Sequence, residues 1–212
     1  RSYVIISQYP REWIEFFNAG QSAVDMSNWT VSDGVEFTFP SGTSLEAGKY
    51  LVVARSAERF KADNGSDPDL IWTSGALSNS GENLEVKDAN GNVVDAVDYD
   101  DEGDWGAKSS GSPPTAAAAS ADGLGPSLEL KDFAADNSLP ASWGIVTGAK
   151  GTPGAVNANF SGTPWTSTGG GGSTGGGGGS TAGTGPVRTH PAGTWTGDTS
   201  PKINMLNAAS TD

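Results

Sequence analysis

Short runs of β-branched and aromatic residues, separated by turn residues, recur along most of the chain. In Trp13–Phe17, Ile14 and Phe16 fall on one face of an extended strand, and the other three residues fall on the opposite face. No run shows the periodicity of a long helix, and Ser56–Lys61 predicts a single helical turn. The runs that predict strands are Tyr3–Ser7, Trp13–Asn18, Trp29–Ser32, Phe37–Pro40, Tyr50–Ala54, Leu84–Lys87, Val93–Tyr99, Ser127–Lys131 and Trp143–Val146.

Two neighbouring runs carry further local information. Asn90-Gly91 lies between Leu84–Lys87 and Val93–Tyr99, and this dipeptide favours a type I′ hairpin turn. The second run does not alternate cleanly, which predicts a β-bulge or a strand that is covered on both faces. Many short strands with regular turn residues predict an all-β fold, either a β-sandwich or a barrel.

Composition divides the chain into a body and a tail. Thr168–Thr184 reads TGGGGSTGGGGGSTAGT, which predicts a polar coil. Gly-Gly-Gly-Gly-Ser also occurs in engineered spacers, but the irregular repeat and the Ser/Thr/Pro-rich flanks favour a natural linker. We expect a β-sandwich domain over residues 1–160, with a long loop at Ser109–Asp122. A Gly/Ser/Thr-rich linker over residues 161–185 and an extended C-terminal segment over residues 186–212 would follow it.

Residues 186–212 have too many apolar residues for a linker and too few for an independent core. The apolar residues that we expect to make interaction contacts are Trp195, Ile203, Met205 and Leu206. A sheet edge is a template for another strand, and extended peptides add to such edges through backbone hydrogen bonds. We therefore expect the segment to be a docking strand for an adjacent copy of the chain, which gives a homo-oligomer or a polymer.

Charge and residue types exclude several classes of function. The formal net charge of −13 belongs to residues 1–160 and argues against a nucleic-acid partner. No apolar run is long enough to cross a membrane. The chain has no Cys, and its single histidine, His190, has no neighbouring acid or nucleophile. Glu12 and Glu15, three apart on a strand, point to opposite faces and do not form a convergent carboxylate pair. We expect that the protein is not an enzyme.

One acidic run is a candidate metal site. Asp95, Asp98, Asp100 and Glu102 offer the oxygen ligands that Ca²⁺ prefers, although the spacing lacks the fixed pattern of an EF-hand loop. A solvated acidic loop is the alternative interpretation. Asp63–Asp69 also has the composition of a calcium loop, but Asx-rich turns have the same composition and are favoured there. Calcium is the one cofactor that the sequence suggests.

The tryptophans fall into two groups according to the runs that contain them. Tryptophan rings fill the core of small sandwiches, but they also stack on sugars. Those inside strand-like runs are expected in the core, namely Trp13, Trp29 and Trp143. Those expected to contact a partner, with carbohydrate as one alternative, are Trp105, Trp165 and Trp195.

The order of several longer motifs is specific. The first are EWIEFFN at residues 12–18, VDMSNW at 24–29, SDG at 32–34, FTFP at 37–40 and YLVVAR at 50–55. LSNSGENL at residues 77–84, SLEL at 127–130 and GTPGAVN at 151–157 follow. This succession resembles the lamin tail domain of secreted and surface proteins of bacteria and archaea, over about residues 3–157. It departs from the family at Gln8, where an acidic residue is usual, and in the longer Ser109–Asp122 stretch.

The resemblance implies an immunoglobulin-like β-sandwich without catalytic residues, of a kind that serves interaction or anchoring. Since the chain begins with Arg1 rather than Met, we expect an N-terminal piece, such as a secretion signal, to have been removed. We expect an extracellular or cell-surface structural protein that self-associates through sandwich edges and the C-terminal segment into a filament or surface assembly. The alternative is an accessory binding or anchoring domain of a larger secreted hydrolase.

Overall fold

The computed structural model describes residues 11–78, 81–100, 127–145, 151–167 and 207–208. The expected strand Tyr3–Ser7, the expected loop Ser109–Asp122 and Trp105 lie outside these residues. The strands are β1 (Trp13–Phe17), β2 (Val24–Asp25), β3 (Thr30–Ser32), β4 (Val35–Thr38), β5 (Ser44–Leu45), β6 (Tyr50–Ala54), β7 (Leu70–Ile71), β8 (Ser74–Gly75), β9 (Glu82–Lys87), β10 (Val93–Tyr99), β11 (Ser127–Leu130), β12 (Trp143–Ile145) and β13 (Asn207–Ala208). The helices are α1 (Ala57–Asn64) and the 3₁₀ turn η1 (Pro140–Ser142).

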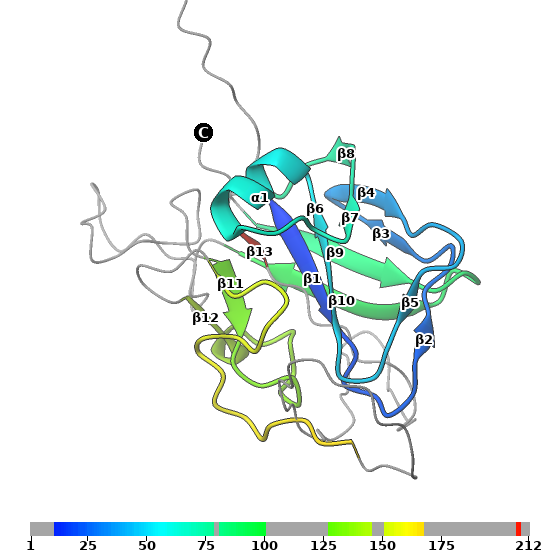
Figure 1. The fold of residues 1–212 in the computed structure, drawn as a ribbon. Coiled ribbons are helices and arrows are strands. Elements are labelled where there is room, and N and C mark those ends of the chain that lie inside the picture. Colours follow the sequence, from blue (N-terminus) through cyan, green and yellow to red (C-terminus); the bar gives the residue numbers. More distant parts are fainter. Residues whose placement is uncertain (1–10, 79–80, 101–126, 146–150, 168–206, 209–212) are drawn as a thin grey trace, which may run out of the picture.

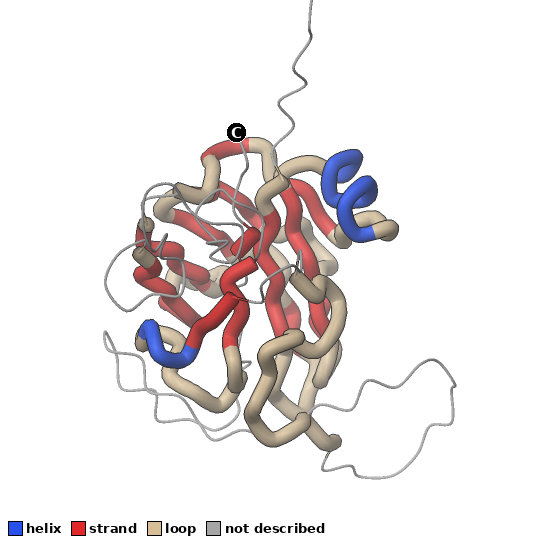
Figure 2. Tube along the Cα trace, turned by 90° about the vertical axis from the view of Figure 1, so that its left-hand side faces the viewer, coloured by secondary structure: helices blue, strands red, loops and turns tan. Residues whose placement is uncertain are grey.

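The strands form an immunoglobulin-like β-sandwich (Figure 1). The largest sheet has the antiparallel order β10-β9-β3-β4-β8. Two smaller sheets have the orders β1-β6-β7 and β12-β11-β13, and β2 pairs with β5. Figure 2 shows the strands stacked on one another, with α1 outside them at one corner. The strands β2, β5, β7 and β8 were not predicted, because two residues are too short to show a period.

The hydrophobic core supports the predicted strand pattern. Trp13, Trp29 and Trp143 are buried in one core cluster, which confirms that they are core residues. Strand β1 is buried along its whole length. Its Phe16 packs edge-on against Phe39 in the core, while Trp13 packs edge-on against Phe60 of α1.

A second, smaller cluster extends the packed body beyond residue 160. Phe17 and Phe133 form its centre, and Phe160 and Trp165 pack against them. The indole Nε1 of Trp165 lies 3.1 Å from the carbonyl oxygens of both Ala19 and Gly20. Trp165, which we expected to contact a partner, thus packs against the body itself.

The β9–β10 connection is a hairpin, but its turn differs from the predicted one. A type I′ turn needs positive φ at both central residues, whereas Asn90 has no positive φ and only Gly91 does, at 84°. The Asp88 carboxylate accepts hydrogen bonds from the backbone N–H groups of Asn90 and Asn92 at 2.8 and 2.9 Å. This side-chain cap favours the longer turn. The predicted bulge is confirmed by the register shift between Val93 and Asp95.

The α1 helix is longer than the single turn that the sequence predicted. Ser56 caps its N-terminus by accepting a hydrogen bond from the Arg59 N–H at 3.3 Å. The helix continues to Asn64, where the αL conformation of Gly65 ends it. Burial of Phe60 against Trp13 anchors the helix to the sheet, and this tertiary contact was not visible in the local propensities.

A substitution at Gly75 tests how closely the backbone of β8 approaches that of β4. It has a φ of 79°, and an added Cβ would meet the carbonyl oxygen of Gly34 and approach the Val35 Cα to 3.0 Å. We expect Gly75→Ala to destabilise the fold by about 1–3 kcal/mol, since the residue is both strained and crowded. Urea unfolding followed by tryptophan fluorescence measures the loss. Gly42→Ala is the matched control, because Gly42 has a φ of 85° but no atom within 4 Å of the added Cβ. Equal losses in the two variants would contradict the proposed crowding.

Candidate functional site

The most unusual feature of the described chain is the junction between β1 and β11. Among the described residues, β1 pairs only with β6, so one of its edges carries no paired strand. β11 pairs with β12 on one side and with β13 on the other. In β13, Asn207 faces Leu128 and Ala208 faces Ser127 in antiparallel register. β13 also lies against β1, so the C-terminal strand occupies the space between the two edges (Figure 1).

Both faces of β11 are buried, and they have different neighbours. Leu128 and Leu130 belong to the main core cluster. Ser127 and Glu129 alternate with them and contact residues 151–161, which we call the strap. The Glu129 carboxylate accepts hydrogen bonds from the Ser127 hydroxyl at 3.0 Å, the Thr152 hydroxyl at 3.3 Å and the Ala158 N–H at 3.0 Å.

The strap holds β1 as well as β11. Within the strap, the Gly154 N–H donates a hydrogen bond to Glu15 of β1. Gly151, with a φ of 99°, leaves no room for a Cβ, which would meet the Ser127 hydroxyl and come within 2.8 Å of the Trp13 ring. These contacts give a physical reason for the GTPG stretch at residues 151–154: the turn brings the Gly154 N–H against Glu15 of β1 and the Thr152 hydroxyl against Glu129 of β11.

Among the described residues, Glu15 has a buried carboxylate oxygen without a hydrogen-bond partner. The residue is 1% exposed, and its Oε1 has no hydrogen-bond partner among the described residues. Burial raises the pKa of Glu15 well above its ordinary value, and the charges of Glu129 and Asp69 raise this pKa further, while the Gly154 N–H opposes the rise. Glu15 therefore binds its proton more tightly in the folded state than in the unfolded state.

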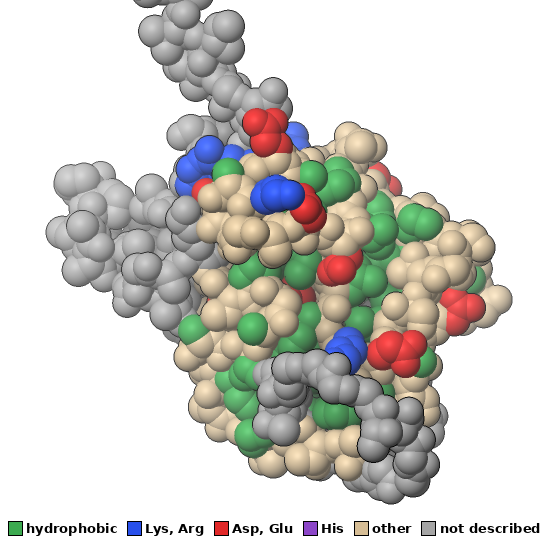
Figure 3. Space-filling model, in the orientation of Figure 1, with side chains coloured by type: hydrophobic (Ala, Val, Ile, Leu, Met, Phe, Trp, Pro, Cys, Tyr) green, Lys and Arg blue, Asp and Glu red, His purple; other side chains and the backbone are tan. Residues whose placement is uncertain are grey.

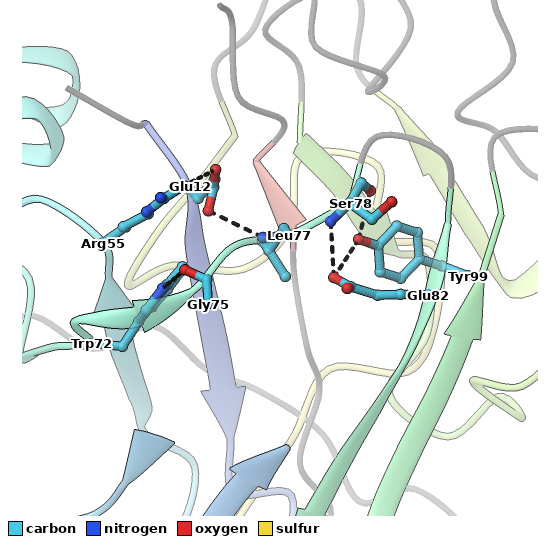
Figure 4. Close-up of polar contacts among 8 residues, drawn as sticks. All are labelled: Glu12, Arg55, Trp72, Gly75, Leu77, Ser78, Glu82 and Tyr99. Atoms are coloured by element: carbon cyan, nitrogen blue, oxygen red, sulfur yellow. Dashed lines mark hydrogen bonds and ion pairs between the residues drawn. The ribbon is translucent and has the colours of Figure 1, made fainter. Parts of the chain in front are cut away.

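Glu12 lies in a separate polar network, which Figure 4 shows. It is 2% exposed and contacts Arg55 at 2.8 Å between Oε1 and Nη1, while its Oε2 accepts a hydrogen bond from the Leu77 N–H at 3.1 Å. Burial raises the pKa of Glu12, although the Leu77 N–H and Arg55 oppose this rise. Glu12 and Glu15 thus have different partners, as the predicted strand geometry requires.

The LSNSGENL motif forms the second half of the network in Figure 4. The Glu82 Oε1 accepts a hydrogen bond from the Ser78 N–H at 2.9 Å and lies 2.8 Å from the Tyr99 hydroxyl. The same hydroxyl lies 2.7 Å from the Ser78 carbonyl oxygen, so its single proton is shared between two acceptors. Burial raises the pKa of Glu82. These groups form hydrogen bonds with one another, and they link Ser78, which precedes β9, to Tyr99 of β10.

The predicted calcium ligands do not all lie together in the described residues. Asp95 is buried, and both of its carboxylate oxygens accept hydrogen bonds from the Asn137 side chain, at 2.9 and 3.0 Å. Asp98 and Asp100 are exposed, and Glu102 lies outside the described residues. Within the described part of the chain, no group of three acidic or histidine side chains is arranged to hold a metal. The calcium site at these residues stays a prediction.

The second acidic stretch, Asp63–Asp69, is held by partners inside the protein. Asp63 pairs with Arg11 at 3.4 Å, and Asp67 pairs with Lys61 at 2.7 Å. Asp69 accepts a hydrogen bond from the Val52 N–H at 2.7 Å. In Figure 3, basic side chains gather at the α1 end of the molecule, which is where these acidic partners lie.

The predicted interaction residues Trp195, Ile203, Met205 and Leu206 lie outside the described residues, as does His190. The junction itself was not predicted as a unit, because β1 and β11 are far apart in the sequence. Its one signal was the pair of motifs SLEL and GTPG, which contributed only to the family resemblance. No helix among the described residues is long and apolar enough to span a membrane.

A family model described as the lamin tail domain matches residues 1–101. No curated protein matches the chain. The match covers the elements from β1 to β10, while the expected continuation of the resemblance to residue 157 stays a prediction.

The raised pKa of Glu15 predicts a specific pH dependence of stability. Below the ordinary carboxyl pKa both states are protonated. As pH rises above that value, Glu15 loses its proton first in the unfolded state. The free energy of unfolding that protonated Glu15 contributes therefore falls as pH rises from the ordinary pKa to the raised pKa of the folded state. We expect Glu15→Gln to raise the melting temperature relative to wild type, and the difference to grow from pH 4.5 to pH 7. Scanning calorimetry measures it, with the exposed Glu36→Gln as control. A difference independent of pH would contradict the interpretation.

The calcium prediction is tested with the full chain. If the site formed by Asp95, Asp98, Asp100 and Glu102 binds Ca²⁺ in the folded state, adding Ca²⁺ after chelation should raise the melting temperature by mass action. Asp100→Asn should reduce that rise, whereas Asp25→Asn, at an exposed site elsewhere, should not. An unchanged melting temperature with Ca²⁺ and with chelator would remove the site.

Proposed function

Since residues 1–101 belong to the lamin tail domain family, an immunoglobulin-like fold of non-enzymatic interaction domains, we propose that this protein is an extracellular structural protein that self-associates. Association runs through sandwich edges and the C-terminal segment, residues 186–212, and produces a filament or a surface assembly. The role is non-catalytic.

The pairing of β13 with β11 carries this proposal. Asn207 and Ala208 belong to the segment that the sequence predicted as a docking strand, and they are hydrogen-bonded at the edge of a sheet. Backbone pairing of this kind is the basis of β-augmentation, in which an extended peptide extends an exposed sheet. The apolar residues Ile203, Met205 and Leu206 immediately precede β13 in the sequence. We infer that they add side-chain contacts to the same docking event.

The buried polar groups of the body support a structural role. Glu12 is held by Arg55 and a backbone N–H, and Glu129 is held by hydroxyl groups and a backbone N–H. A catalytic pair would instead need to converge on a site that a substrate can reach. The buried carboxylates Glu12, Glu15 and Glu129 join parts of the body to one another, and we infer that its sheet edges are the surfaces for interaction.

Deletion of residues 186–212 tests the proposed self-association. We expect the full chain to form higher oligomers or fibres and the truncated chain to remain a monomer, because the docking strand is lost. Size-exclusion chromatography with light scattering and electron microscopy measure the outcome. If the two proteins assemble alike, the proposal is wrong.

A milder variant separates docking from a general effect of the tail. We expect the double variant Met205→Asp and Leu206→Asp to raise the dissociation constant for assembly by at least about tenfold, which corresponds to about 1.4 kcal/mol. The matched control, Thr196→Asp and Thr199→Asp, adds the same charge to polar positions of the same segment. It should assemble like the wild type.

A further inference from the structure

We propose that the space between β1 and β11 is an acceptor slot, and that its occupant in the assembly is the C-terminal strand of a second copy of this chain. This inference rests on the proposed self-association and adds the acceptor, the polarity and the register of the contact. The donor strand runs antiparallel to β11, with Ala208 facing Ser127.

The slot is bounded on two sides in the described structure, by the hydrophobic core and by the strap. On one side Leu128 and Leu130 belong to the main core. On the other side the strap covers the slot, because it is bonded to Glu15 of β1 and to Glu129 of β11. β1 and β11 are therefore held as neighbours by side-chain contacts, without being paired to each other in the described structure.

The backbone of β11 explains why the slot needs an occupant. All four residues of β11 are buried. Buried backbone N–H and C=O groups are nearly always paired in proteins, and an unpaired group costs free energy. β12 pairs with one edge of β11, and β13 pairs with the other at Ser127 and Leu128. The strap amides of Asn157 and Asn159 donate hydrogen bonds to the carbonyl oxygens of Leu130 and Glu129, so the added strand is needed at the first two residues of β11. An ordinary edge strand presents its free groups to water, whereas this edge is enclosed by β1, the core and the strap.

The length of chain that precedes β13 allows the strand to reach the slot of a second copy. Residues 168–206 separate the packed body from β13, and they would extend to on the order of 130 Å at most. As a coil they would span about 35 Å, close to the ~40 Å diameter of a domain of this size. The slot of an adjacent copy is thus within reach of the same strand.

Exchange of the strand between copies conserves every contact in the slot. Docking within one chain is favoured by an effective concentration of roughly millimolar or less, because that concentration falls as the tether lengthens. When copies are packed more densely than this, as in a surface assembly, docking on a neighbour is favoured. Donor and acceptor are different surfaces of the chain, so the contact is heterologous and generates a ring or an open filament.

Disulfide trapping in the full-length protein tests the acceptor, since the chain has no Cys to give a background. Facing residues of antiparallel strands have Cα atoms about 4.5–5.5 Å apart, which a disulfide can bridge. A tagged Ser127→Cys chain is mixed with an untagged Ala208→Cys chain under assembling conditions and oxidised. We expect a tagged–untagged heterodimer on a non-reducing gel, with residues 127 and 208 linked by mass spectrometry.

Val93→Cys is the control acceptor. Val93 is 40% exposed on β10, at an edge of the five-stranded sheet. A cysteine thiol introduced there is more accessible than one at the buried position 127. The 127–208 heterodimer should be several-fold more abundant than the 93–208 heterodimer. Equal abundance overturns the proposal. So does a doubly substituted chain, Ser127→Cys with Ala208→Cys, that gives only intrachain disulfides at assembling concentrations.

A proline variant provides an independent readout without touching the body. Ala208→Pro removes a backbone N–H from the donor strand, and we expect it to weaken assembly several-fold in light scattering. Ala182→Pro, in the Gly-rich stretch, should have no effect. Equal assembly of both variants with wild type overturns the slot. If deletion of residues 186–212 abolishes assembly while trapping fails, the slot is wrong and self-association stands; if the deletion leaves assembly intact, self-association itself is wrong.

Discussion

The hydrogen bonds from the strap to Glu15 and Glu129 are the constraint on which the arrangement of this molecule depends. They join β1, from the start of the chain, to β11, which lies more than a hundred residues later. Two carboxylates buried on neighbouring strands would repel each other, and backbone N–H groups at the strap offset that cost on both sides. The position of β11 and β12 on the sandwich follows from this link, and so does the space that β13 occupies.

The described body uses its polar chemistry for internal cohesion. Glu12, Glu82 and Asp95 each accept hydrogen bonds from groups far away in the sequence, namely Leu77 and Arg55, Tyr99, and Asn137. Such networks give a sandwich a specific arrangement of its strands, although each charge is costly to bury. The proposed association through sheet edges would leave these networks untouched. A non-catalytic role for a lamin tail domain and an edge-based mode of association are therefore mutually consistent.

The accuracy of the sequence predictions depended on how local each feature is. The main strands, the bulge in β10 and the buried Trp13, Trp29 and Trp143 were predicted, because period and residue type reveal burial directly. The type I′ turn was wrong because the Asp88 side chain selects a longer turn. The length of α1 was wrong because Phe60 anchors the helix to Trp13. Trp165 was expected to contact a partner, but it packs on Ala19 and Gly20.

The sequence by itself determined the all-β architecture, the resemblance to the lamin tail domain, whose family model matches residues 1–101, the acidic body and the apolar residues of the C-terminal segment. These properties follow from short-range alternation, composition and ordered motifs. Only the tertiary structure decided that Glu15 and Glu129 share the strap and that β13 pairs with β11 beside β1. The physical reason is sequence separation: a hydrogen bond between residues 15 and 154 leaves no periodic trace in either segment, because folding of the whole chain selects the two partners together.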